Sequence, residues 1–179
     1  MLPKPLQTIL ILALIIGVSG CGFKLRGSAE PLPEQIRQLT LVGINKGSDF
    51  YQSLAQALIS AGASLKKGNA TEESATVTIH KVGQSRDEVS DSGGQTLYRS
   101  NFMVTFSLDL NRGRGESRLI DSRQLRASRE FSFDSNNPYG LEQQDQLLRN
   151  ELQRELIQQL LRQIRAAGLV KDSTRGVTR

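Results

Sequence analysis

The sequence predicts an α+β fold, a two-layer sandwich in which a four-stranded, mixed but mostly antiparallel sheet carries two helices on one face. Three segments between residues 75 and 133 alternate apolar and polar side chains, as strands with one buried face do. Two other segments repeat apolar residues at helical spacing. We therefore expect a single α/β domain over residues 36–168, in the order strand, helix, three strands, helix.

The first strand and the first helix follow each other closely. Residues 36–44, IRQLTLVGI, have the composition of a short strand closed by Gly43. Ser48 is suited to cap the helix that follows, and Gly62 marks its end. The apolar positions between them recur at helical spacing and are Tyr51, Leu54, Ala55, Leu58 and Ile59.

Three strands are then expected, over residues 75–82, 96–110 and 118–133. The middle one alternates most regularly, and its shared apolar face consists of Tyr98, Phe102, Val104, Phe106, Leu108 and Leu110. The connecting segments 83–95 and 111–118 contain glycine and charged residues, so each is expected to be a hairpin loop.

The last helix is expected to begin near Pro138 and to end at Gly168. Its buried stripe would consist of Leu141, Leu148, Leu152, Leu156, Leu160, Ile164 and Ala167. The Gln, Glu and Arg residues on its other face indicate an ordinary solvated surface, so no nucleic-acid partner is expected. Residues 169–179 show no periodicity and are expected to be a disordered tail.

The N-terminus has the order of a bacterial lipoprotein signal. Residues 1–20 contain an uncharged Leu- and Ile-rich run that is shorter than the roughly 20 apolar residues of a membrane span. Small residues then precede Cys21, the only cysteine, which would become the lipid-modified first residue of the mature chain. Residues 21–35 would form the lipidated N-terminus and a tether. The alternative is an ordinary signal peptide or a single-span anchor with an incidental cysteine.

Charge favours an anionic partner. Without residues 1–20, the chain has 22 Lys plus Arg and 18 Asp plus Glu, a net charge of +4. Most of these cations are arginines, whose planar fork can bind phosphate or carboxylate with two hydrogen bonds. With Cys21 as the only cysteine, no intrachain disulfide can form.

Basic residues gather at the two expected hairpin loops. These candidates for contact with an anionic headgroup are Arg86, Arg99, Arg112, Arg114 and Arg118. The alternative is that hairpin tips are polar and rich in glycine because they turn in water.

Catalysis and metal binding have little support. His80 is the only histidine and has no cysteine partner for a metal site. The chain lacks a G-x-S-x-G elbow, a phosphate loop and an H-E-x-x-H motif, so an envelope hydrolase has no recognisable nucleophile. We expect no enzyme activity, no metal, and no cofactor other than the covalent lipid on Cys21.

Three short motifs resemble the LptE family of lipopolysaccharide-assembly lipoproteins. They are GCGFKLRG at residues 20–27, GGQTLYR at 93–99 and FDSNNPYGLEQQDQ at 133–146, and the expected order of elements is similar too. The sequence departs from the family pattern at Asp91, Ser92 and Glu142, so no headgroup contact is carried over to those positions. The five candidate arginines come from the charge pattern alone.

The resemblance implies a protein of the outer membrane of Gram-negative bacteria. LptE-like proteins plug the large β-barrel LptD, assist its assembly and bind lipopolysaccharide on its way to the cell surface. Gly22, which follows the cysteine, is compatible with sorting to the outer membrane. The protein would be lipid-anchored there, facing the periplasm and lying within the barrel lumen. The competing hypothesis is a pilot or structural lipoprotein that supports another envelope complex without binding lipopolysaccharide.

Overall fold

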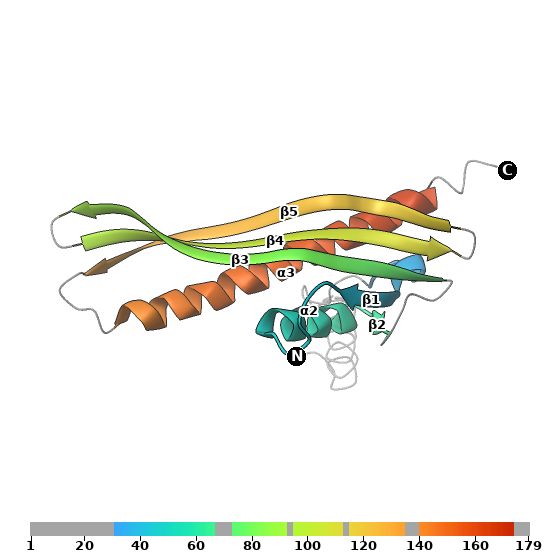
Figure 1. Cartoon of the computed structure of the whole chain (residues 1–179), viewed down its shortest axis with the longest axis horizontal. Helices are drawn as coiled ribbons and strands as arrows, with labels where there is room; N and C mark the ends of the chain where they lie inside the picture. The colour runs from blue at the N-terminus through green and yellow to red at the C-terminus, as the bar shows by residue number, and fades with distance from the viewer. Residues whose placement is uncertain (1–30, 67–72, 93–94, 113–114, 135–139, 174–179) are drawn as a thin grey trace, which may run out of the picture.

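The computed structural model describes residues 31–66, 73–92, 95–112, 115–134 and 140–173 (Figure 1). In chain order its elements are η1 (Glu34–Ile36), β1 (Gln38–Val42), α2 (Asp49–Ser60), β2 (Ser64–Leu65), β3 (Glu73–Ser92), β4 (Gln95–Arg112), β5 (Gly115–Asp134) and α3 (Leu141–Ser173).

The sheet is mixed and has five strands in the order β2-β1-β3-β4-β5. Strand β1 is parallel to both β2 and β3, whereas β3, β4 and β5 form an antiparallel meander. The α+β class is therefore confirmed, but the expected number of four strands is wrong. The missing strand is β2, whose two residues are too few to show alternation, and its ends are held by hydrogen bonds from Ser64 N to Arg37 O and from Lys66 N to Leu39 O.

The first strand and helix form where the sequence predicts them. The Ser48 hydroxyl caps α2 by accepting a hydrogen bond from Tyr51 N at 3.2 Å. Gly62 follows the helix with φ +86°, a conformation that other residues rarely adopt. The buried side chains of α2 are Phe50, Leu54, Ala55 and Leu58, while Ile59, expected inside, is exposed.

The two expected hairpin loops are mostly strand. Residues 83–92 belong to β3, and residues 111, 112 and 115–118 belong to β4 and β5. Glycine and charged residues are rare in isolated strands, but here they pair with β4 in a register that runs from Glu73↔Arg112 to Ser92↔Gln95 and shifts only at Ile79/Lys81 and Glu88/Ser90. The meander is therefore longer than the alternation of apolar residues predicts.

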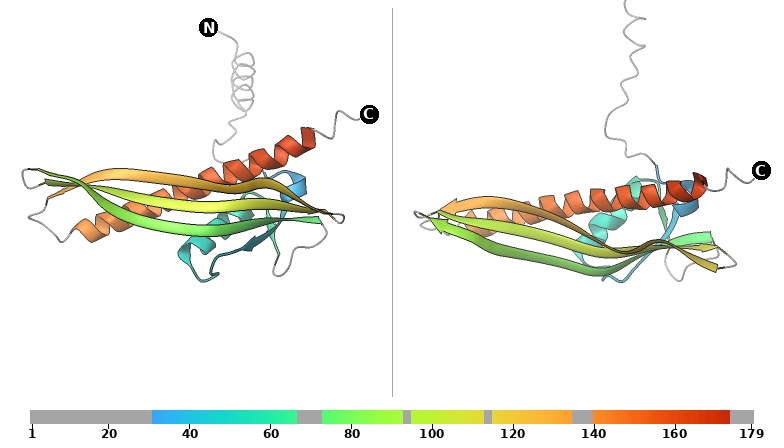
Figure 2. Two further views of the ribbon diagram at one scale, coloured as in Figure 1. Left: turned by 45° about the horizontal axis from the view of Figure 1, so that its top comes forward. Right: turned by 90° about the horizontal axis from the view of Figure 1, so that it is seen from above.

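One face of the sheet is packed against the helices, and Figure 2 shows both helices on that side. The alternation predicted for β4 is confirmed from Phe102 onward, because Phe102, Val104, Phe106, Leu108 and Leu110 are all buried, whereas Tyr98 is half-buried. Helix α3 crosses β4 and β5, and α2 packs beside it. Each fully buried side chain of this kind stabilises the fold by about 1.5–3 kcal/mol.

Helix α3 does not end at Gly168, as the sequence suggests, but continues to Ser173. Gly168 is buried against η1, where a Cβ would lie 2.8 Å from Ile36 Cδ1 and 3.0 Å from Pro33 Cγ. This glycine therefore permits close packing rather than helix termination. The expected disorder is wrong for residues 169–173, and residues 174–179 lie outside the described part of the chain.

Most of the predicted stripe of α3 is confirmed. Leu152, Leu156, Leu160 and Ile164 are buried, with Ile157 and Leu161 beside them, whereas Leu141, Leu148 and Ala167 are half-buried.

The last residues of the expected tether belong to the folded domain. Leu32 and Ile36 are buried in the core, and Leu32 N donates a hydrogen bond to Ala61 O at 2.9 Å. The Gln35 side chain also donates to Gly168 O. A Pro-containing segment has the same composition whether it is a free tether or packs against the domain. Composition alone therefore misplaces the boundary between the tether and the domain.

The expected signal segment and Cys21 lie outside the described residues. Within the described ranges, no helix combines the length and hydrophobicity that a membrane span requires.

Candidate functional site

The described candidate arginines lie toward opposite ends of the sheet. Arg99 is near the start of β4, whereas Arg118 contacts Asp109 near the end of that strand. Residues 99 and 109 are about 34 Å apart along a strand that rises about 3.4 Å per residue. Arg112 ends β4 on the Arg118 side, and Arg114 lies outside the described residues. The structure therefore does not bring this set together around one headgroup.

Arg86 faces the helices. Its Nη1 donates to Asp145 Oδ2 at 3.1 Å and lies 3.7 Å from Glu142 Oε2. Its guanidinium is also 5.6 Å from the Tyr98 ring centroid, which is within cation–π range. Arg86 thus joins β3 to the start of α3. Its charge is used within the fold rather than presented to an external headgroup.

Arg99 and Arg118 lie beside carboxylates. Arg99 Nη2 lies 2.5 Å from Glu130 Oε1, and Arg118 Nε lies 2.9 Å from Asp109 Oδ1. The Arg99–Glu130 pair is exposed on both sides and contributes only about 0–1 kcal/mol to stability, whereas Asp109 is buried. Both pairs reduce the charge available to an external anion.

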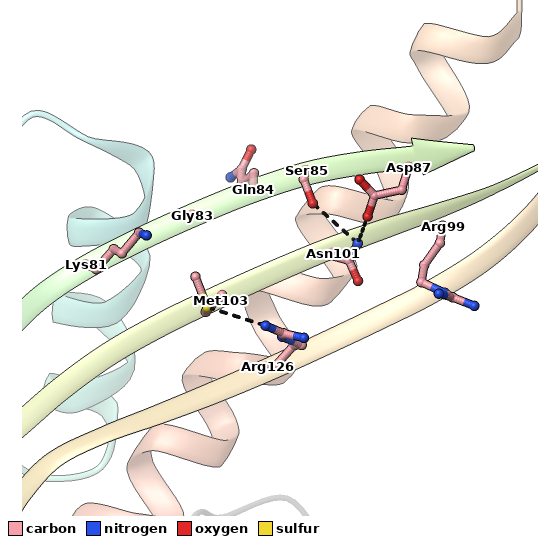
Figure 3. Close-up of a pocket in the computed structure, with 9 residues that line it drawn as sticks. All are labelled: Lys81, Gly83, Gln84, Ser85, Asp87, Arg99, Asn101, Met103 and Arg126. Carbon is pink, nitrogen blue, oxygen red and sulfur yellow. Dashed lines mark hydrogen bonds between the residues drawn. The ribbon is translucent and has the colours of Figure 1, made fainter. Parts of the chain in front are cut away.

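A hollow of about 460 Å³ lies across β3, β4 and β5 on the face opposite the helices (Figure 3). Its lining residues are Lys81, Gly83, Gln84, Ser85, Asp87, Arg99, Asn101, Met103 and Arg126. Gly83, Met103 and Arg126 form one row across the three strands. Because Gly83 has no side chain, the hollow is open above Met103, the apolar part of its floor.

Lys81 and Arg126 give the hollow its available positive charge. Neither has a carboxylate partner among the described residues, and Arg126 Nη2 makes a weak contact with Met103 Sδ at 3.9 Å. By contrast, Asp87 accepts from Asn101 Nδ2 at 2.7 Å, and Arg99 is next to Glu130. The hollow therefore offers two free cations above an apolar floor.

Sequence reasoning missed this pair because it searched the loops. Lys81 and Arg126 both belong to expected strands. Arg126 alternates with buried Ala127, whereas Lys81 is two residues after buried Ile79 and reaches the polar face only through the register shift between these two residues. Pairing the polar faces of neighbouring strands could have found Arg126, but not Lys81, because strict alternation places Lys81 on the apolar face.

The arrangement suits noncovalent binding of an anion that carries an apolar part. Lysine and arginine donate to phosphate or carboxylate oxygens, and the methionine side chain offers a flexible apolar contact. His80 Nε2 lies 2.9 Å from Ser107 Oγ, yet no carboxylate is among the described contacts of His80, so a catalytic triad is not assembled. The described residues also hold no cluster of three potential metal ligands.

Comparison with known proteins identifies both a family and a fold. The family described as "LptE: Lipopolysaccharide-assembly" matches residues 36–164. A comparison with curated proteins finds no match.

Three solved lipoproteins share the fold. A minor lipoprotein from Acinetobacter baumannii is 24% identical, with a TM-score of 0.60 over 76% of this chain and 94% of that chain. Lipoprotein B from Nitrosomonas europaea is 22% identical, with a TM-score of 0.63 over 81% and 91%. Rare lipoprotein B from Shewanella oneidensis is 14% identical, with a TM-score of 0.62 over 75% and 98%.

Proposed function

Because the chain belongs to the LptE family of lipopolysaccharide-assembly proteins, we propose that it binds lipopolysaccharide in complex with an LptD-like barrel of the outer membrane. It would be anchored there through a lipid on Cys21 and would face the periplasm and the barrel lumen. It would act by binding alone, without catalysis.

The observation that carries the lipopolysaccharide part of the proposal is the open hollow with its two free cations. Lys81 and Arg126 would donate to the phosphates of lipid A, and Met103 would contact the start of an acyl chain. A hydrogen bond to a charged group contributes about 1.5–3 kcal/mol. Binding would compete with the divalent ions that bridge neighbouring lipopolysaccharides.

The two-layer architecture supports the proposed complex with a barrel. In the described part of the chain, α2 and α3 cover one face of the sheet, and no described helix covers the hollow on the opposite face. The outward side of α3 carries charged and amide residues such as Arg154, Gln158 and Arg162. The lumen of a transmembrane barrel is also polar, so this helix surface is suited to contact its wall.

The first experiment is affinity purification of the lipidated chain from detergent-solubilised envelope, followed by mass spectrometry of the bound proteins. Stoichiometric recovery of a large, heat-modifiable barrel supports the plug complex. Recovery of a different assembly, under conditions that preserve outer-membrane complexes, would favour the pilot lipoprotein instead.

The second experiment measures lipopolysaccharide binding by the purified chain. The double variant Lys81→Glu/Arg126→Glu should bind at least about tenfold more weakly, because tenfold corresponds to about 1.4 kcal/mol. The matched control is Arg154→Glu/Arg162→Glu, which changes the net charge equally on exposed positions of α3. Equal losses in both variants would mean that only net charge matters and that the hollow is not the site.

A further inference from the structure

Strand β3 has a free edge along more than half of its length. Strand β1 pairs with residues 75–78 only, and no described strand lies beside β3 beyond that point. Residues 80–90 are all exposed except for half-buried Gly83, and the exposed ones include Val82 and Val89, while the side chain of Arg86 is turned to Asp145. An edge of this kind presents main-chain N–H and C=O groups to any extended chain that can reach it.

The close approach of Gly43 to β3 explains why β1 stops. Gly43 has φ +83°, and a Cβ there would lie 2.2 Å from Ile79 O. The chain can take this course only with glycine, and it then turns away toward α2. The edge beyond Ile79 is therefore left open by a specific local geometry.

Along the open edge, the pairing of β3 with β4 is regular between two register shifts. Register shifts occur between Ile79 and Lys81 and between Glu88 and Ser90, whereas residues 81–88 pair with β4 without interruption. Eight strand residues span about 26 Å, which is enough for several main-chain hydrogen bonds to a neighbour. Bulges commonly limit strand pairing, so these two define the length that a new strand could occupy.

Charge distinguishes this edge from the other edge of the sheet. Residues 81–88 carry two basic and two acidic side chains, of which Arg86 is already bound to Asp145. Residues 123–130 of β5 carry three arginines and one glutamate. Residues 81–88 therefore have no net charge and favour an uncharged segment. The β5 edge has a net positive charge and does not share this preference.

A groove of about 420 Å³ lies beside the same stretch. Val82 and Gln84 form its β3 side, and the rest comes from the start of α2 and from the first half of α3. Its lining is rich in amides, with apolar Ile44 and Phe50 and one residue of each charge, Asp49 and Arg149; the amide residues besides Gln84 are Asn45, Gln146, Asn150 and Gln153. Alternate side chains of an added strand would enter this groove, where small uncharged polar groups could bond with the amides.

We propose that the free edge of β3, residues 81–88, receives an extended, uncharged polar segment of the barrel partner as an additional strand. This proposal rests on the proposed function, which supplies the barrel. The strands of a closed barrel already have both edges paired, so the segment must come from one of its loops or from a terminal segment. The added strand would border the hollow, because Lys81, Gly83, Ser85 and Asp87 line that hollow from β3.

Hydrogen exchange of the main-chain amides tests the proposal, with the lipidated full chain measured alone and in its purified complex with the barrel. Amides within residues 81–88 that point away from β4 should exchange at least about tenfold more slowly in the complex. Amides of residues 123–130 serve as the control and should change less.

A photo-crosslinking residue in place of Val82, Gln84 or Glu88 gives a second readout. The crosslinked positions in the barrel protein, mapped by mass spectrometry, should advance in one direction along a single segment as the probe moves along β3. Probes in place of Gln124 and Ser128 on β5 should not give that series.

The outcomes separate the two proposals. A complex that forms normally while residues 81–88 exchange as fast as before would overturn the added strand and leave the proposed function intact. Crosslinks scattered over several segments would do the same. If no barrel is recovered with the wild-type chain, both proposals are wrong.

Discussion

The Asp145 carboxylate accepts a hydrogen bond from Arg86 Nη1 at 3.1 Å and thereby joins the start of α3 to β3. The Asp145 side chain is fully buried, and it also contacts Arg149 and the Ser100 hydroxyl. The two arginine side chains remain about 30% exposed, so water shares the solvation of their charge. The buried Asp145 carboxylate thus connects the start of α3 to strands β3 and β4.

Asp145→Ala should lower the free energy of unfolding by about 2–4 kcal/mol, because removing the shared partner leaves two cations facing each other. Arg86→Ala should cost less, about 1–2 kcal/mol, because Arg149 and Ser100 still bind the carboxylate. Urea denaturation of the chain without residues 1–21 measures both values. Arg99→Ala, which removes an exposed pair with Glu130, is the control and should cost less than about 1 kcal/mol.

The order of the two effects is the decisive result. If Arg86→Ala is as destabilising as Asp145→Ala, then Arg149 does not share the carboxylate, and the network is a single pair.

Gly43→Ala should destabilise the fold by at least about 2 kcal/mol, because it combines a positive φ with a clash against rigid main chain. The new Cβ would meet Ile79 O, an atom that cannot move without disturbing the β1–β3 pairing. Gly47→Ala is the matched control in the same connection, where φ is not positive and the nearest atom, Asn45 Oδ1, is 3.4 Å away.

Thermal unfolding of both glycine variants gives the comparison. The Gly47 variant should stay within about 0.5 kcal/mol of the wild type. Equal stability of the two variants would contradict the close approach of residue 43 to β3.

Gly168→Ala should destabilise the protein although alanine is the better helix former. The expected gain in helix propensity is about 1 kcal/mol, whereas overpacking a close contact costs about 1–3 kcal/mol. The clash involves Ile36 Cδ1, which Ile36→Val removes. A double-mutant cycle should therefore show that Ile36→Val costs less in the alanine background than in the wild type. Additive effects would show that residues 36 and 168 do not touch.

Periodicity was sufficient to predict the elements that bury an apolar face. The alternation in β4, the repeat in α2 and the cap at Ser48 each depend on neighbours in the sequence, and each is found in the structure. The strand extensions over residues 83–92 could not be predicted in this way, because they are held by pairing with β4 rather than by burial.

Two further features depend on contacts between distant residues. Glycine is typical of helix ends, but Gly168 is required because Ile36 packs so close that a Cβ would not fit. Arg86 has the residue type of a headgroup ligand, but it is bound by Asp145, which is 59 positions away in the chain. Within the described part of the chain, Lys81 and Arg126 have no carboxylate partner, and only the sheet register places them on the same hollow.

Cys21→Ser should abolish incorporation of a labelled fatty acid into the chain and release the protein from the membrane fraction. Two or more acyl chains hold a protein at a bilayer far more firmly than one chain, whose binding is marginal and reversible. Serine preserves the size of the side chain but removes the thiol that would form the thioether. Ser19→Ala is the control, because it keeps a small residue before the cysteine and should leave labelling unchanged. If the Cys21 variant stays in the membrane fraction as an uncleaved chain, residues 1–20 act as a span, and the single-span alternative is correct.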